Sequence, residues 1–295
     1  MLKRTIIVTS PSRLTLKNGQ LVCTCISDDT DVKTAPVEDI GIVIVENQRA
    51  TLSVPLISAL AANNASIVFC DSHFMPSSVT MSLCSNATQS EMLKAQVSAT
   101  EATNNRLWKQ IIEAKIKNQA SLLGKLGKDS NVLKPYYSNV KSGDADNREG
   151  IAARLYWKEL FGSDFSRERD GGAPNNMLNY GYSILRTAVV RALLGSGLNL
   201  GFGIFHRNKY NPMPLADDVM EPFRPFVDEI VYELVCNGEI ELTTEVKSFI
   251  VDVLSCDTVF DNNKRPLQVG LSMTTASLGR CYLEKQKKLS LPKLE

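Results

Sequence analysis

Short apolar segments separated by turn residues dominate the first 75 residues and predict a strand-rich domain. Residues 14–17 and 20–23 lie on either side of an Asn-Gly pair. Asparagine followed by glycine supplies the positive φ values of a two-residue hairpin turn, so we expect these segments to pair as antiparallel strands. Residues 42–45 and 67–70 are runs rich in β-branched side chains, as in buried strands, and a short helix is expected between them at 53–61.

The hydrophobic pattern changes beyond residue 85 to the 3.6-residue period of helices. Polar and small residues fill positions 76–85, so we expect a linker there. Helices are expected at 89–126, 149–160, 177–194, 244–255 and 269–282. The pattern therefore predicts an α+β protein, with a small β-rich domain at 1–75 and a larger all-α domain at 86–295. The basic tail, 284–295, contains a proline and is expected to be mobile.

Another amphipathic segment, at 208–235, carries most of the candidate chemistry. Its apolar face is formed by Leu215, Val219, Phe223, Phe226, Val227, Ile230, Val231 and Leu234. Pro222 and Pro225 interrupt the middle of this pattern. Because an interior proline removes a backbone donor, we expect a kink in the helix there.

Acidic residues gather at the margin of that apolar face. Helical spacing places Asp217 or Asp218 beside Glu221, with Arg224 next along the same stripe. Carboxylates this close repel one another, and a divalent cation would relieve the repulsion, with His206 near enough in sequence to contribute. A solvated helix face, or an acidic first turn favoured by the helix dipole, is the alternative interpretation.

Composition narrows the class of protein. The chain has 295 residues, 43% of them hydrophobic and 22% charged, which is ordinary for a globular protein. Its seven cysteines form no CxxC pair and there are only two histidines, so a zinc site is not expected. The sequence contains no GxGxxG, GxxxxGK[ST], HExxH or GxSxG motif. With no apolar run long enough for a signal peptide or a membrane span, a cytoplasmic location is expected.

Charge is distributed unevenly although the net charge is only +1. Residues 101–210 carry 17 basic and 10 acidic side chains, whereas residues 211–295 carry 9 and 14. A basic middle followed by an acidic segment is typical of proteins that combine phosphate contacts with metal-binding carboxylates. The helix expected at 89–126 carries lysines on its polar faces: Lys109, Lys115, Lys117 and Lys125. These lysines either follow a phosphate backbone or are simply solvated.

Three sequence blocks together resemble one known family. They are EGIAARLYW at 149–157, NYGYSILRTAVVRALLGSGLNLGFGIFHRN at 179–208 and LADDVMEPFRPFVD at 215–228. These blocks resemble the CRISPR-associated integrase of spacer acquisition, the universal adaptation endonuclease. The form DDVMEPFRP resembles the versions found in type II systems, which have a single-protein RNA-guided effector nuclease.

The resemblance implies a set of site residues. Glu149, His206 and Glu221 correspond to the glutamate, histidine and second carboxylate that hold a divalent metal, Mg²⁺ or Mn²⁺, in the family. Asp218 is given an accessory catalytic role, and the sequence leaves open which of Asp217, Asp218 and Glu221 contacts the ion directly. Read by itself, Glu149 also fits a simpler role at the first turn of a helix, where an acid is favoured by the dipole.

The resemblance also implies an activity and partners. A DNA 3′-hydroxyl would attack a repeat phosphodiester, and water in its place would give endonuclease activity. The expected partners are double-stranded DNA (prespacer and CRISPR repeat), a second copy of the chain joined through the β-rich domain, and a small dimeric companion protein. A stand-alone metal-dependent nuclease and a non-catalytic DNA-binding scaffold are the alternatives.

Overall fold

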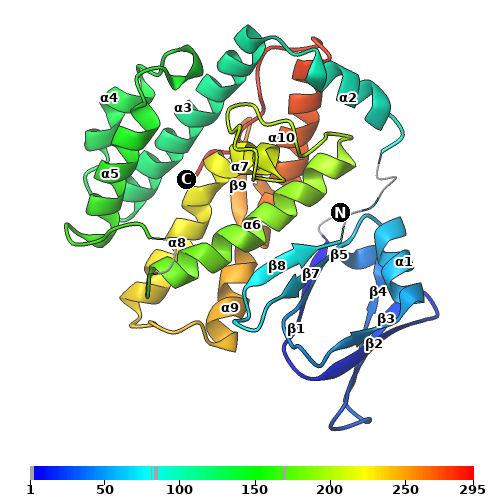
Figure 1. The fold of residues 1–295 in the computed structure, drawn as a ribbon. Helices are drawn as coiled ribbons and strands as arrows, with labels where there is room; N and C mark the ends of the chain where they lie inside the picture. Colours follow the sequence, from blue (N-terminus) through cyan, green and yellow to red (C-terminus); the bar gives the residue numbers. More distant parts are fainter. Residues whose placement is uncertain (1–2, 81, 83–85, 169–170) are drawn as a thin grey trace. The chain divides into compact units, whose positions relative to one another are not determined.

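The computed structural model describes residues 3–80, 82, 86–168 and 171–295, and the chain divides into two compact units (Figure 1). The first unit is Met1–Asn86 and the second is Ala87–Glu295. Strands are the main secondary structure of the first unit, and helices are the main secondary structure of the second. The expected α+β class, with a strand-rich region followed by a helical region, is confirmed.

In its described residues, the first unit contains two four-stranded sheets, one α-helix and a short 3₁₀ helix. One sheet has the order β1 (Arg4–Val8), β5 (Ile40–Val45), β7 (Ser66–Cys70), β8 (Pro76–Val79). The other has the order β4 (Val32–Pro36), β3 (Gln20–Cys25), β2 (Ser12–Lys17), β6 (Thr51–Leu52). Both sheets and the helix α1 (Val54–Ala62) contribute side chains to one hydrophobic core.

The expected hairpin is present, and the expected linker is partly wrong. Strands β2 and β3 pair with Asn18 and Gly19 in the turn, at φ values of 50° and 73°. Within the range 76–85, however, Pro76–Val79 forms strand β8, which pairs antiparallel with β7. Its polar composition does not predict a strand, because an edge strand has a neighbour on one side only and tolerates polar residues. Residues 81 and 83–85 of the expected linker lie outside the described residues.

The second unit is built mainly from helices. They are α2 (Gln89–Val97), α3 (Glu101–Lys125), α4 (Lys134–Tyr137), α5 (Arg148–Phe161), α6 (Asn175–Gly195), α7 (Pro214–Met220), α8 (Arg224–Cys236), α9 (Thr244–Val251) and α10 (Leu267–Tyr282). The helix expected at 89–126 is interrupted at Thr100, whose hydroxyl accepts the Thr103 N–H and so begins α3. None of the helices in the described part of the chain combines the length and apolar character needed to cross a bilayer.

An all-α second domain is not what the structure contains. Strands β9 (Asp257–Phe260) and β10 (Asn263–Pro266) pair as an antiparallel hairpin. Its turn residues, Asp261 and Asn262, have positive φ values of 47° and 65°. These are values that Asp and Asn tolerate better than most residues, and they suit a two-residue hairpin.

The prolines of the 208–235 segment divide it as expected. Helix α7 ends at Met220, a single 3₁₀ turn η4 (Glu221–Phe223) follows, and α8 begins at Arg224. Pro222 and Pro225 each occupy one of the first two positions of an element, where a missing N–H costs nothing. The interruption places Glu221 in a turn rather than in the middle of a helix.

The C-terminal tail is packed against α3, so the expectation of a mobile tail is wrong. The Nδ2 of Asn118 on α3 donates to the Pro222 carbonyl at 2.8 Å and to the Pro292 carbonyl at 3.1 Å. Its Oδ1 accepts the Leu294 N–H, and the Leu294 side chain is buried. Asn118 therefore ties the tail and the turn η4 to the same point of α3.

Replacing Asn118 with alanine tests this junction. Asn118→Ala leaves two carbonyls and one N–H without a partner in a buried place, and we expect the free energy of unfolding to fall by about 3 kcal/mol. Denaturant unfolding followed by tryptophan fluorescence measures it, because both tryptophans, Trp108 and Trp157, lie in the helical unit. Asn139→Ala is the matched control, since Asn139 is exposed and donates only to the Pro135 carbonyl. An equal loss in both variants would show that Asn118 does not hold the tail and the turn η4 on α3.

Candidate active site

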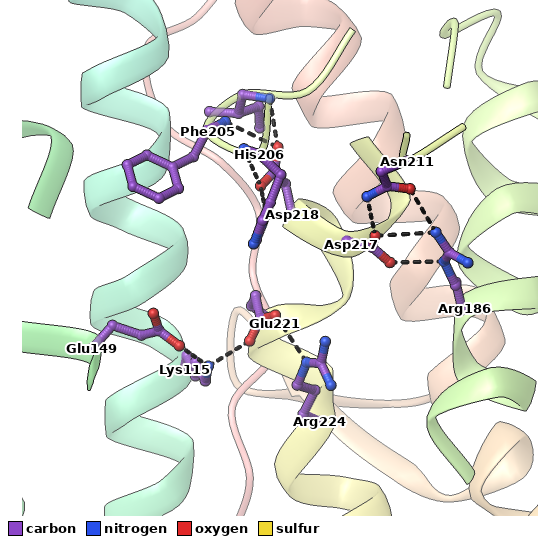
Figure 2. Close-up of polar contacts among 11 residues, drawn as sticks. Lys115, Glu149, Arg186, Phe205, His206, Asn211, Asp217, Asp218, Glu221 and Arg224 are labelled. Atoms are coloured by element: carbon purple, nitrogen blue, oxygen red, sulfur yellow. Dashed lines mark hydrogen bonds and ion pairs between the residues drawn. The ribbon is translucent and has the colours of Figure 1, made fainter. Parts of the chain in front are cut away.

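Side chains from separate segments of the helical unit meet beside α3 (Figure 2). Helix α3 contributes Lys115, the first turn of α5 contributes Glu149, and the turn η4 contributes Glu221. His206 lies in the loop between α6 and α7. The sequence places these residues far apart, and packing of the helices against α3 brings them together.

Glu149 does not cap its own helix. The side chain of Asn147 caps α5 by accepting the Gly150 N–H, and Asp144 accepts the N–H groups of Arg148 and Glu149. The carboxylate of Glu149 is instead 2.5 Å from the ammonium of Lys115. Since other residues satisfy the helix terminus, the simpler capping role does not account for Glu149.

Lys115 is the feature that sequence reasoning missed. Its Nζ is 2.5 Å from Glu149 Oε1 and 2.5 Å from Glu221 Oε2, and the residue is 7% exposed. We expected a solvated or phosphate-facing lysine, and that expectation is wrong. A signal was present in the sequence, because Lys115 lies seven residues after Trp108 and seven before Leu122, which are both buried.

Glu221 is a buried carboxylate held between two cations. Arg224 Nε donates to its Oε1 at 2.9 Å, and Lys115 lies against its Oε2 (Figure 2). Burial by itself would raise the pKa of Glu221, but the charges of Arg224 and Lys115 outweigh it and lower the pKa to about 2. Glu221 is therefore ionised at neutral pH despite having a side chain only 6% exposed.

Asp218 fixes the loop that carries His206. Its carboxylate is fully buried and accepts the backbone N–H groups of Ile204, Phe205 and His206. The ring Nδ1 of His206 lies 2.6 Å from Asp218 Oδ1, and this hydrogen bond raises the pKa of the imidazole. Gly203 allows the close approach, because a Cβ there would lie 2.4 Å from the His206 carbonyl oxygen. Asp218 thus orients His206 and has both oxygens engaged.

Asp217 points to a different cluster. Arg186 Nε lies 2.7 Å from its Oδ1, and the Asn211 amide donates to its Oδ2 at 2.6 Å (Figure 2). Arg186 also donates to Asn211, which closes a three-residue network. The two neighbouring aspartates therefore have separate partners, and neither contacts Glu221 in the way helical spacing had suggested.

The predicted ligands are close together but separated by a lysine. Glu149 and Glu221 contact the same ammonium, and His206 is close enough to Glu221 for their charges to interact. Nevertheless, across residues 3–80, 82, 86–168 and 171–295, no three His, Cys, Asp or Glu side chains form a group arranged to hold an ion. The place where two carboxylates converge is taken by Lys115.

A loop surface beside His206 offers room for a ligand. A pocket of 470 Å³ opens there, and its lining includes Phe202, Arg207, Lys209 and Asn104. Phe202 is 45% exposed and Tyr210, on the same loop, is 81% exposed. Phe205, on the same loop, stacks parallel on Trp108 of α3, with 4.5 Å between ring centroids. Basic and aromatic side chains of this loop thus lie beside His206.

Arg224 also contacts a buried hydrogen-bond network formed by Asp228 and two tyrosines. Asp228 on α8 is 1% exposed and accepts hydrogen bonds from the hydroxyls of Tyr156, at 2.8 Å, and Tyr182. The Arg224 guanidinium lies over the Tyr182 ring, 4.5 Å from its centroid. Burial raises the pKa of Asp228 to about 6, even though the two tyrosines and Arg224 act in the opposite direction.

The chain matches a known protein family over most of its length. A family model described as "CRISPR associated protein Cas1" matches residues 6–248. A CRISPR-associated endonuclease Cas1 from Neisseria meningitidis serogroup C (strain 8013) is 34% identical over 296 residues, which cover 99% of this chain and 96% of the relative.

Solved structures share the fold. A structure titled "Casposase bound to integration product" has a TM-score of 0.80 at 20% identity, covering 98% of this chain and 93% of that one. A second, titled "Cas6-RT-Cas1--Cas2 complex", has a TM-score of 0.75 at 18% identity, covering 99% of this chain and 36% of that one. The fold is therefore one that casposases and Cas1-containing proteins share. The family match and the Neisseria relative go further: this chain belongs to the CRISPR-associated protein Cas1 family. The resemblance seen in the three sequence blocks is confirmed.

The raised pKa of Asp228 predicts a pH-dependent stability. Its folded pKa of about 6 exceeds the ordinary value of 3.8, so the folded protein takes up a proton. The contribution to stability is fully present below pH 3.8 and is lost as the pH rises through 6, a change of about 3 kcal/mol. The unfolding free energy of the wild type minus that of Asp228→Asn, measured at pH values from 4 to 7.5, should fall accordingly. A difference that does not change with pH would contradict this.

Proposed function

We propose that this chain is a metal-dependent DNA endonuclease and integrase, which inserts short foreign DNA (prespacers) into a CRISPR array. In the reaction, a prespacer 3′-hydroxyl attacks a phosphodiester of the repeat. The observation that carries the proposal is the convergence of Glu149 and Glu221, from distant parts of the chain, on the Lys115 ammonium, with His206 close enough to Glu221 for their charges to interact.

The residues present fit a hard divalent cation. Glu221 Oε2 is buried, and its partner among the described residues is the positively charged ammonium of Lys115, 2.5 Å away. Two carboxylates and an imidazole are a donor set that suits Mg²⁺ or Mn²⁺. Glu149, His206 and Glu221 would hold the ion. When bound, it would polarise the scissile phosphate and stabilise charge on the leaving oxygen.

The protein's own groups prepare this site. When His206 donates its Nδ1–H to Asp218, the lone pair of Nε2 remains available to a metal, which is the usual arrangement of a carboxylate behind a histidine ligand. Three backbone N–H groups on the same carboxylate keep the imidazole in position. Arg224 keeps Glu221 ionised and fixed in the turn η4. Asp218 and Arg224 are positioning residues in this scheme.

DNA is the substrate that suits the surrounding surface. Arg207 and Lys209, on the loop beside His206, can neutralise backbone phosphates. Phe202 and Tyr210 are exposed on the same loop, and bases of a single-stranded end can stack on them. The casposase structure that shares this fold is titled as bound to an integration product, which supports strand transfer as the reaction.

The proposed assembly contains more than one chain. Strands β1 and β4 lie at the edges of their sheets in the strand-rich unit, and such edges are natural surfaces for pairing with a second copy. We propose a homodimer joined through this unit. A structure titled as a complex of Cas1 with Cas2 supports a small dimeric companion protein as a further partner. Double-stranded DNA of the prespacer and the repeat would be bound by the assembled proteins.

Removing the proposed ligands tests the reaction. Purified protein with its companion is given a duplex bearing free 3′-hydroxyls and a plasmid carrying the repeat, in Mg²⁺ or Mn²⁺. Glu149→Gln, His206→Ala and Glu221→Gln should each lower covalent joining by at least about a hundredfold. Glutamine is preferred to alanine at Glu221 because the side chain is buried between two cations.

The control and the alternatives follow from the same assay. Glu113→Ala, on α3 but paired with Lys109 at 3.7 Å, should join DNA at the wild-type rate. Cleavage of the plasmid without joining would favour a stand-alone nuclease. DNA binding with neither reaction in either metal would favour a non-catalytic scaffold. Joining at the wild-type rate by His206→Ala would refute the proposed metal site.

A further inference from the structure

The ammonium of Lys115 occupies the point where a cation would bind. It contacts one oxygen of Glu149 and one oxygen of Glu221, which are two of the three residues proposed to hold a divalent ion (Figure 2). The side chain of Lys115 is 9% exposed, so it reaches this point from inside the helical packing and not from solvent. Its stem lies on the buried side of α3, next to Ile111, Ile112 and Ile116.

Charge at the site is already balanced by protein groups. Glu149 and Glu221 carry two negative charges, and Lys115 and Arg224 supply two positive ones. A divalent ion that used the same carboxylate oxygens would have to lie within a few ångströms of the ammonium. Two cations at that separation in a poorly solvated place repel each other strongly. The ion and the ammonium therefore cannot both occupy the position between the two carboxylates.

The two cations differ in how they hold their partner. Among the described residues, Arg224 forms its ion pair with Glu221 through Oε1, and its guanidinium lies over the Tyr182 ring. Lys115 bridges both carboxylates and makes no other contact of this kind among the described residues. Its flexible stem can move the charge away, whereas Arg224 is held in place. The ammonium of Lys115 would leave the site towards Glu149, whose side chain is 32% exposed, because the Glu221 side chain is only 6% exposed.

We propose that Lys115 is a tethered counter-ion that competes with the divalent metal for Glu149 and Glu221. In the metal-free protein it holds the two carboxylates together, and it leaves their oxygens when the ion binds. Lys115 thereby weakens metal affinity while it stabilises the metal-free fold. This inference rests on the proposed metal site, and it assigns to Lys115 a positioning role.

Neutralising the charge while keeping the stem tests the proposal. Mn²⁺ affinity is measured by calorimetry and electron paramagnetic resonance for the wild type and Lys115→Met, without DNA. Thermal unfolding of each is measured in chelator and in Mn²⁺. We expect Lys115→Met to bind Mn²⁺ tighter by on the order of tenfold to a hundredfold, because repulsion from the ammonium is gone. Its melting temperature should fall in chelator and rise more than that of the wild type on adding Mn²⁺.

Two further variants sharpen the result. Lys125→Met is the matched control, since Lys125 is also on α3 but pairs with Glu229 at 2.9 Å, and its Mn²⁺ affinity should equal that of the wild type. Lys115→Arg keeps the positive charge and should bind Mn²⁺ no more tightly than the wild type. A purely structural ion pair would instead lower stability in Lys115→Met without tightening metal binding.

The outcomes separate this inference from the proposed function. If the wild type binds Mn²⁺ and Lys115→Met binds it equally or less tightly, the counter-ion role is overturned and the metal site stands. If neither protein binds Mn²⁺, both are overturned. If Lys115→Met does not fold, the proposal is tested on the wild-type protein instead. Reductive methylation followed by mass spectrometry then measures how fast Lys115 is modified. Lys115 should be protected in chelator and modified several-fold faster in Mg²⁺, and equal protection in both would overturn the proposal.

Discussion

The site depends on bringing two like-charged carboxylates together in a buried place. Glu149 and Glu221 repel each other, and the fold tolerates their approach because Lys115 and Arg224 compensate the charge. The long helix α3 supplies the lysine, and the other elements present their side chains along it. The interruption of the α7–α8 segment by Pro222 has a direct role, since it places Glu221 in a short turn facing Lys115. Asn118 secures the same turn and the C-terminal tail to α3.

A second constraint concerns His206, which lies on a loop that would otherwise be free to move. The carboxylate of Asp218 gathers three backbone N–H groups and the imidazole, so the loop is shaped around one buried acid. Asp217, the next residue in sequence, points to Arg186 and Asn211 instead. The two aspartates therefore have different roles: Asp218 orients His206, and Asp217 links α7 to α6 through Arg186.

Sequence alone predicted the fold class, the hairpin and the proline interruption, because each has a local cause in spacing or turn chemistry. It could not assemble the site, since Glu149 and Glu221 are 72 positions apart and only packing against α3 joins them. Family resemblance identified them as a set. Lys115 was misjudged because a lysine is usually solvated, although its position in the buried period of α3 was visible. Strand β8 and the tail were missed because polar composition concealed their pairing with β7 and α3.

We propose that Glu149, His206 and Glu221 form a single cation site, and that the Lys115 ammonium fills it when no metal is bound. Anomalous diffraction from crystals of the full chain grown with Mn²⁺ tests it most directly. We expect one manganese peak in contact with Glu149, His206 and Glu221, with the Lys115 ammonium withdrawn from both carboxylates. A manganese peak bound at Asp217 and Asn211, or a Lys115 that keeps both contacts in crystals saturated with Mn²⁺, would contradict it.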